Sequence, residues 1–304
     1  MLEVCLLGTG GMMPLPNRWL TSLLMRFNGV SILVDCGEGT QIPLRKNGYS
    51  PNPIDVMCIT HFHADHISGL PGMLLAMKNA EKETPLTIIG PKGLTNIVRS
   101  LRVIAPALPF DVNCMEIEGS EETFSFPGFR LEAFKVNHNV LCYGYSMVVD
   151  RIGRFDVERA KALGLDIKFW NPLQKGNEIV TEDGRKITPD MVLGPPRKGL
   201  RVTYATDSRP TASIEEHARG ADLFICEGMY GEPGMEQDAV EKKHMTFAEA
   251  AEIAVRACPD EMWLTHYSPS FVHPERFVDE ARRIFPASVA AKDGRSIDLN
   301  FKGD

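Results

Sequence analysis

The segment H-F-H-A-D-H at positions 61–66 constrains this chain most, because it places four side chains of metal-binding type within six residues. It directly follows the short apolar run Val56–Thr60, which predicts a β-strand. Side chains alternate along a strand, so the first two histidines project to one side, and the last two ligand-type residues follow where the chain turns into a helix. The alternative is a polar loop with accidental histidines. The crowding of ligand types favours part of a two-metal site, since Zn²⁺ and similar cations prefer imidazole and carboxylate ligands.

Three further residues supply the ligands that a six-residue cluster lacks. His138, Asp207 and His266 each follow an apolar run, at the carboxyl end of a predicted strand. Open α/β folds gather their sites at such strand ends. Any one of them alone is more typical of a hydrogen-bonded structural residue, but a carboxylate can bridge two cations. The predicted ligands are His61, His63, His138 and Asp207 for one metal, and Asp65, His66, Asp207 and His266 for the other.

Short apolar runs bounded by glycine or acidic residues recur along the chain and predict strands. The predicted strands are Val4–Leu7, Ser31–Val34, Val56–Thr60, Leu86–Ile89, Leu131–Val136, Arg201–Thr206, Asp222–Glu227 and Glu261–Thr265. Helical patterns occupy Ser68–Asn79, Ile214–Arg219, Thr246–Ala257 and His273–Ile284. The 304 residues, 43% of them hydrophobic, exclude a disordered chain. Two rounds of strands and helices predict an α/β fold in which helices cover sheets.

Charge and cysteine content narrow the class of protein further. The formal charge is 33 − 40 = −7, which excludes a protein that coats nucleic acid with its whole surface but allows a local basic patch. The seven cysteines form no C-x-x-C pair and predict reduced thiols in a cytoplasmic protein. The N-terminus does not resemble a signal peptide, and no run approaches the roughly 18 apolar residues that a membrane span needs.

The stretch from Arg151 to Arg201 departs from the rest of the chain. Four prolines and several glycines interrupt it, and no clean alternation of strands and helices is predicted there. Its charge balance is 11 − 7 = +4, whereas the remainder carries 22 − 33 = −11. One interpretation is a solvated insertion. The other is a basic arm that binds a polyanion.

Several motifs give the chain a family resemblance. T-H-F-H-A-D-H-I-S-G-L-P-G at 60–72 resembles the signature of the metallo-β-lactamase superfamily. L-G-T-G at 7–10, G-E-G-T-Q at 37–41 and K-H-M-T at 243–246 are similar to the ribonuclease Z family of tRNA 3′-end endonucleases, over nearly the whole chain. The resemblance implies a single αβ/βα sandwich domain over 1–304, with a tRNA-binding arm at about 151–201. It also implies a homodimer in which each arm serves the partner's active site.

The resemblance further implies a di-zinc hydrolase that cleaves the trailer from pre-tRNA and leaves a 3′-hydroxyl, with Mn²⁺ or Fe²⁺ as possible substitutes. The same seven ligands match the family, Asp65 is implied as a proton acceptor, and His244 is implied as the residue that protonates the leaving oxygen. Glu227 either orients His244 or is a surface carboxylate at a strand end. The chain departs from the family at 164–170, where a Gly-Pro-rich turn is usual, and at 268–270, which reads S-P-S instead of S-x-R.

The sequence offers three candidate contacts to substrate and two rival functions. Arg209, Lys168 and Lys175 are the candidate contacts to substrate phosphates, and the alternative for Arg209 is a salt bridge beside a helix. The first rival function is hydrolysis of a smaller phosphodiester or another ester. The second is a metal-stabilised nucleic-acid-binding module without activity. The di-iron branch of the superfamily carries Glu where this chain has Ala64, which argues against redox chemistry.

Overall fold

The computed structural model describes residues 1–303, which separate into two compact units. Unit 1 comprises Met1–Val148 and Arg201–Asn300, and unit 2 comprises Val149–Leu200 together with the chain end from Phe301. No helix within the described residues is both long and apolar enough to cross a membrane. All seven cysteines are free thiols, and five of them are buried.

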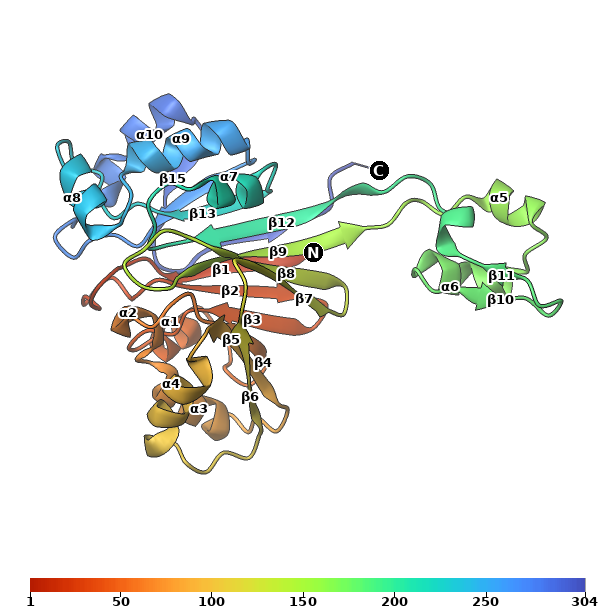
Figure 1. The fold of residues 1–304 in the computed structure, drawn as a ribbon, viewed down its shortest axis with the longest axis horizontal. Helices are drawn as coiled ribbons and strands as arrows, with labels where there is room; N and C mark the ends of the chain where they lie inside the picture. Colours follow the sequence, from red (N-terminus) through yellow and green to blue (C-terminus); the bar gives the residue numbers. More distant parts are fainter. Residues whose placement is uncertain (304) are drawn as a thin grey trace. The chain divides into compact units, whose positions relative to one another are not determined.

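Unit 1 is built on two seven-stranded sheets (Figure 1). In order across the first sheet, the strands are β16 (Arg295–Leu299), β1 (Leu2–Gly8), β2 (Ser22–Phe27), β3 (Val30–Val34), β4 (Ile54–Cys58), β5 (Leu86–Pro91) and β6 (Val112–Ile117). The second sheet runs β15 (Ser288–Ala290), β14 (Met262–Thr265), β13 (Leu223–Glu227), β12 (Arg197–Ala205), β9 (Tyr143–Arg151), β8 (Phe129–Lys135) and β7 (Glu121–Phe126). Neighbouring strands are parallel in the series β3–β4–β5–β6 and in the series β12–β13–β14–β15. Neighbouring strands are antiparallel in the series β16–β1–β2–β3 and β7–β8–β9.

Helices cover the outer face of each sheet, which gives four layers (Figure 1). The first sheet is covered by α1 (Gln41–Lys46), α2 (Ala64–Ile67), α3 (Leu70–Asn79), α4 (Leu94–Leu101) and the 3₁₀ turn η1 (Arg102–Ile104). The second half of the chain adds α7 (Ala212–Ala218), α8 (Glu236–Lys242), α9 (Phe247–Ala257), η4 (Pro274–Arg276) and α10 (Val278–Ile284). Buried Met73 and Met77 of α3 belong to the same buried cluster as Leu33 of β3, and Ala250 and Ala254 of α9 belong to the buried cluster of the second sheet. The predicted α/β sandwich is confirmed.

Buried side chains also fill the space between the two sheets, where their inner faces meet. Tyr145 of β9 donates a hydrogen bond to the carbonyl of Ile59, just after β4, at 2.8 Å. Thr21 and Thr265, at the ends of strands in opposite sheets, have hydroxyls 3.3 Å apart. These polar contacts are buried and satisfied, so they fix how the strand ends of one sheet face those of the other.

The structure corrects two predicted helix boundaries, and the local sequence helps to explain where the helices begin. The predicted helix Ser68–Asn79 begins two residues later as α3, with Pro71 in the first turn, where its missing N–H has no partner to lose. The predicted helix His273–Ile284 divides into η4 and α10, with Phe277 between them at φ −111° and ψ −4°. α9 begins with a capping box between Thr246 and Glu249, as its sequence favours.

Unit 2 contains short elements that the sequence did not predict. They are α5 (Val157–Ala162), η2 (Ile167–Phe169), α6 (Trp170–Gln174), β10 (Ile179–Val180), β11 (Lys186–Ile187) and η3 (Pro189–Met191). The two helices precede the two strands without regular alternation, and the buried residues Ala160, Leu165, Leu173, Ile187 and Val192 form a small core of their own. Each element has at most six residues, too few for a periodic signal.

Replacement of Leu33 by alanine tests the buried cluster to which β3 and α3 both contribute. Leu33 is fully buried, so Leu33→Ala leaves a cavity and we expect it to lower the free energy of unfolding by about 2–5 kcal/mol. Leu75, on the exposed face of α3, is the matched control, and Leu75→Ala should change stability by less than about 0.5 kcal/mol. Urea unfolding followed by circular dichroism measures both, and equal losses would contradict the assigned core.

Candidate metal centre

Four loops at strand ends bring the seven predicted ligands together at one edge of unit 1. The H-x-H-x-D-H segment follows β4 and enters α2, His138 follows β8, Asp207 follows β12 and His266 follows β14. Asp207 and His266 both have left-handed backbones, with φ of 53° and 59°. A left-handed backbone is unfavourable for residues other than glycine, so the surrounding structure must hold both positions in this conformation. These turns aim both side chains back across the sheet edge.

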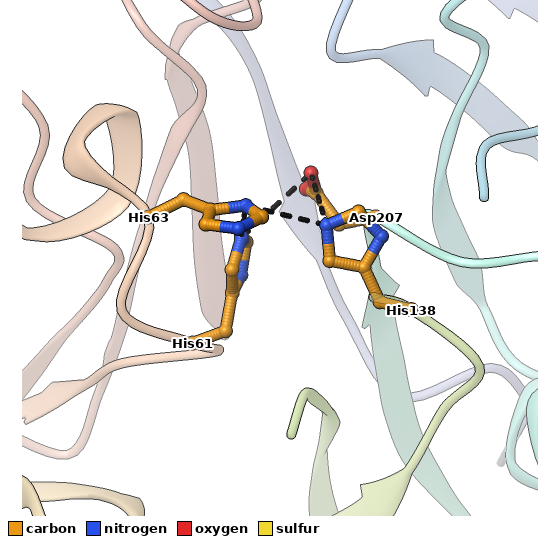
Figure 2. A group of neighbouring side chains, drawn as sticks. All are labelled: His61, His63, His138 and Asp207. Carbon is orange, nitrogen blue, oxygen red and sulfur yellow. Dashed lines mark hydrogen bonds and ion pairs between the residues drawn. The ribbon is translucent and has the colours of Figure 1, made fainter. Parts of the chain in front are cut away.

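The first ligand group consists of His61, His63, His138 and Asp207, which point toward one another in Figure 2. His61 Nε2 lies 2.9 Å from His63 Nδ1, and His138 Nε2 lies 3.3 Å from the same nitrogen. Asp207 Oδ1 is 3.9 Å from His61 Nε2 and 3.8 Å from His138 Nε2. All four ligand atoms lie within 4.8 Å of one another, so a single cation could contact all of them.

The second group adjoins the first through the other oxygen of Asp207. His66 Nε2 and His266 Nε2 are 3.2 Å apart, and Asp65 Oδ2 lies 3.4 Å from each. Asp207 Oδ2 lies 3.2 Å from His66 and 3.3 Å from His266. The carboxylate of Asp207 therefore faces both groups, one oxygen to each.

The chemistry of the donor atoms fits metal binding. Ring nitrogens of different histidines face one another at hydrogen-bond distance, although buried imidazoles have no reason to gather without a shared partner. Asp207 Oδ2 is buried with no well-aligned hydrogen bond and with only the ring nitrogens of His66 and His266 close to it, which is costly for a carboxylate unless a cation compensates it. Burial lowers the pKa of His61 and His138, which keeps both rings in the neutral form that ligates metals.

Asp35 holds two of the ligand histidines from behind. Its carboxylate is fully buried and accepts hydrogen bonds from His66 Nδ1 at 2.8 Å, Thr60 N at 2.9 Å, Thr60 Oγ1 at 3.0 Å and Tyr204 OH at 3.2 Å. Thr60 Oγ1 also lies 3.0 Å from His61 Nδ1. Because Nδ1 of His66 contacts Asp35 and Nδ1 of His61 contacts Thr60, each of these two rings presents its Nε2 atom to the ligand groups. Sequence reasoning missed Asp35, although it stands at a predicted strand end just as Asp207 does.

Gly37 of the G-E-G-T-Q motif and Gly11, just after the L-G-T-G motif, permit close approach behind the ligands. A Cβ on Gly37 would lie 2.0 Å from the carbonyl oxygen of Asp65, so only glycine lets the G-E-G-T-Q loop pack against the metal-binding loop. A Cβ on Gly11 would lie 2.7 Å from the ring of His266. The backbone reinforces the first contact, since Cys36 N donates to His66 O at 2.8 Å.

His244 lies beside both ligand groups. Its ring centroid is 5.2 Å from that of His138 and 5.5 Å from that of His266. His244 Nδ1 lies 3.1 Å from Glu227 Oε2, and Glu227 is fully buried instead of lying at the surface. Burial opposes protonation of His244, but Glu227 outweighs it and raises the pKa of His244 to about 9.

The three predicted substrate contacts lie in different surroundings. Arg209 is in unit 1, where its guanidinium bonds Glu249 and the carbonyl of His244, so the salt-bridge alternative describes its contacts. Lys168 is in unit 2 and pairs with Glu182 and Asp166. Lys175 is exposed in unit 2. Of the three, Arg209 belongs to the same unit as the ligand groups, whereas Lys168 and Lys175 belong to unit 2.

Comparison with known proteins identifies the family. The sequence pattern of the family described as "Anti-Pycsar protein Apyc1" matches residues 2–155, which end just inside unit 2. Ribonuclease Z of Lachnospira eligens is 60% identical over 301 residues, which cover 99% of this chain and 99% of the relative. The chain belongs to the ribonuclease Z family. The match covers 99% of this chain, so it extends over the ligand loops and the H-x-T segment at 244–246.

Solved structures support the same fold at lower sequence identity. The short form of human tRNase Z matches with a TM-score of 0.71 and 22% identity, over 98% of this chain and 100% of that chain. The metallo-β-lactamase fold protein YhfI of Bacillus subtilis matches with a TM-score of 0.69 and 22% identity, over 97% and 98% of the two chains. The metallo-β-lactamase fold predicted from the sequence is confirmed.

Replacement of Asp35 by asparagine tests whether this carboxylate orients ligands. We expect Asp35→Asn to weaken metal binding by about 10–100-fold, because His66 Nδ1 loses its carboxylate acceptor and Thr60, which contacts His61 Nδ1, loses the carboxylate that orients its hydroxyl. Competition with a chromogenic chelator measures the affinity, and the rise in melting temperature on addition of Zn²⁺ gives a second readout. Asp111→Asn, at an exposed site, is the control. Unchanged affinity in Asp35→Asn would show that the carboxylate only supports packing.

Proposed function

We propose that the protein is a metal-dependent endoribonuclease that removes the 3′ trailer from pre-tRNA and leaves a 3′-hydroxyl. The observation that carries the proposal is the position of the buried His244–Glu227 pair beside two ligand groups that share Asp207. Membership of the ribonuclease Z family over the whole chain supports this choice of substrate. The free cysteines fit a reducing cytoplasm as the site of action.

The cofactor in this proposal is a pair of Zn²⁺ ions, for which Mn²⁺ or Fe²⁺ could substitute. One ion would be held by His61, His63, His138 and Asp207, and the other by Asp65, His66, Asp207 and His266. Bound divalent cations supply Lewis acidity, which lowers the pKa of water and offsets charge that develops on phosphate oxygens.

Asp65 and His244 handle the two protons of the hydrolysis. Asp65 accepts a proton as water attacks phosphorus, and its position is fixed by the backbone N–H of Met12, which donates to Oδ2 at 2.7 Å. His244 uses Nδ1 for Glu227, which leaves Nε2 to donate a proton to the departing 3′-oxygen. The products are tRNA with a 3′-hydroxyl and a trailer with a 5′-phosphate.

Unit 2 is the proposed tRNA-binding arm. The stretch 151–201 carries a balance of 11 − 7 = +4 in a chain that is acidic overall, and a basic surface attracts the phosphates of RNA. In the same proposal the enzyme is a homodimer, which its family resemblance supports, and light scattering would measure the mass in solution. Hydrolysis of a smaller phosphodiester is the alternative, and the two substrates below distinguish it.

Replacement of His244 by alanine tests the proton donor. We expect His244→Ala to keep its metal content but to lose about 10²–10⁴-fold in the rate of pre-tRNA cleavage. Hydrolysis of bis(p-nitrophenyl) phosphate should fall far less, because p-nitrophenolate leaves without protonation. His273→Ala, at an exposed histidine, is the control. Normal pre-tRNA cleavage by His244→Ala would rule out the acid role, and cleavage of only the small ester by the wild type would support the alternative function.

Deletion of the arm tests its role in binding tRNA. Replacement of residues 152–196 by a short Gly-Ser linker joins Arg151 to Arg197 and leaves the ligand residues of unit 1 in place. We expect the KM for pre-tRNA to rise at least about tenfold, and its dependence on salt to weaken, because phosphate contacts are lost. Hydrolysis of bis(p-nitrophenyl) phosphate reports that unit 1 remains folded. An unchanged KM for pre-tRNA would contradict an RNA-binding arm.

A further inference from the structure

Arg209 connects three loops that surround His244. It follows the ligand Asp207 by two residues, and its backbone N–H donates to the carbonyl of Asn137 at 3.0 Å. Asn137 precedes the ligand His138, and its own N–H donates to Ser208 Oγ at 3.0 Å. The backbone at Arg209 therefore ties the loop after β12 to the loop after β8.

The side chain of Arg209 reaches the third loop. Nη1 donates to the carbonyl oxygen of His244 at 2.6 Å and to Glu249 Oε2 at 2.9 Å. Nη2 donates to Glu249 Oε1. The side chain is only 17% exposed, and that of Glu249 is 24% exposed. A bidentate guanidinium–carboxylate pair fixes both the direction and the distance between the two side chains, and partial burial strengthens the interaction.

Glu249 carries the connection onward to the helix that follows His244. Its Oε2 accepts from Thr246 N at 2.9 Å, and its own N–H donates to Thr246 Oγ1 at 3.2 Å. This capping box fixes the start of α9. Arg209 and Glu249 thus hold the backbone of the His244 loop at residue 244 and at residue 246. Glu227 holds the ring, so the imidazole has a defined position relative to the ligand groups.

We propose that Arg209 is a positioning residue for His244 and not a contact to substrate phosphate. The inference rests on the proposed function, because it assigns a support to the proton donor of that reaction. A phosphate would bind in a bidentate manner to the Nη1–Nη2 edge of the Arg209 guanidinium, but Glu249 already occupies this edge. A catalytic group displaced by about 1 Å loses about 10²-fold in rate, so support of this loop has a large effect on turnover.

Kinetics of Arg209→Met and Arg209→Lys on pre-tRNA test the proposal. We expect kcat to fall by about 10–100-fold in both variants, with little change in KM or in its dependence on salt, because lysine keeps the charge but not the two-pronged geometry. Bis(p-nitrophenyl) phosphate hydrolysis should fall far less, since its leaving group needs no acid. Arg256→Met is the matched control, because Arg256 lies on the same helix α9 as Glu249 but forms an exposed ion pair with Glu215 of α7.

A double-mutant cycle with Glu249→Gln adds a readout that a general loss of stability would not give. If Arg209 acts through Glu249, the losses in kcat from Arg209→Met and Glu249→Gln are not additive. Additive losses, or equal losses on both substrates, would overturn the proposal. A higher KM with a flatter salt dependence and unchanged kcat would show instead that Arg209 binds phosphate.

Failure of the proposed function is distinguishable from failure of this inference. If the wild type does not cleave pre-tRNA at all, the proposed function is wrong, whatever Arg209 does. Crystal structures of wild type and Arg209→Met then decide the positioning role directly. Displacement of the 243–246 loop in the variant supports it, and an unmoved loop overturns it.

Discussion

The carboxylate of Asp207 is the contact on which the rest of the site depends. One oxygen faces the group of His61, His63 and His138, and the other faces Asp65, His66 and His266. Only a carboxylate can serve two cations in this way, because an imidazole offers one lone pair once its second nitrogen is held. The left-handed backbone at Asp207, with φ of 53°, places that carboxylate over the sheet edge. Its unfavourable conformation is maintained by the packed strands on either side.

Two further buried carboxylates organise the rings around Asp207. Asp35 accepts four hydrogen bonds and fixes His66 directly and His61 through the hydroxyl of Thr60. Glu227 accepts from Ser208 N and Met245 N and holds the ring of His244. Burial of a carboxylate is costly unless its oxygens are fully hydrogen-bonded. Because both are satisfied, the histidines that they orient have little rotational freedom, which is what metal ligation and proton donation require.

The division into two units separates chemistry from the proposed substrate binding. Every ligand residue, together with His244, Glu227 and Arg209, belongs to unit 1. Unit 2 has its own small core around Leu165, Leu173 and Val192, so it can hold its shape without the ligand residues. The stretch 151–201 is basic in an otherwise acidic chain. Such a separation allows the arm to change in sequence while the ligand loops stay fixed.

The fold class, the family and the residues that gather at one edge can all be predicted from the sequence. Dense motifs such as 60–72 and strand ends such as His266 carry that information locally. The groups that hold these residues in place depend on contacts between distant segments, which no local pattern contains. The partners of Asp35 lie up to 169 residues away, and Arg209 reaches Glu249 across 40 residues. The short elements of unit 2 also escaped prediction, because fewer than two turns of helix give no periodicity. Hydrogen bonds between distant segments depend on how the sheets pack, and packing is a property of the whole chain.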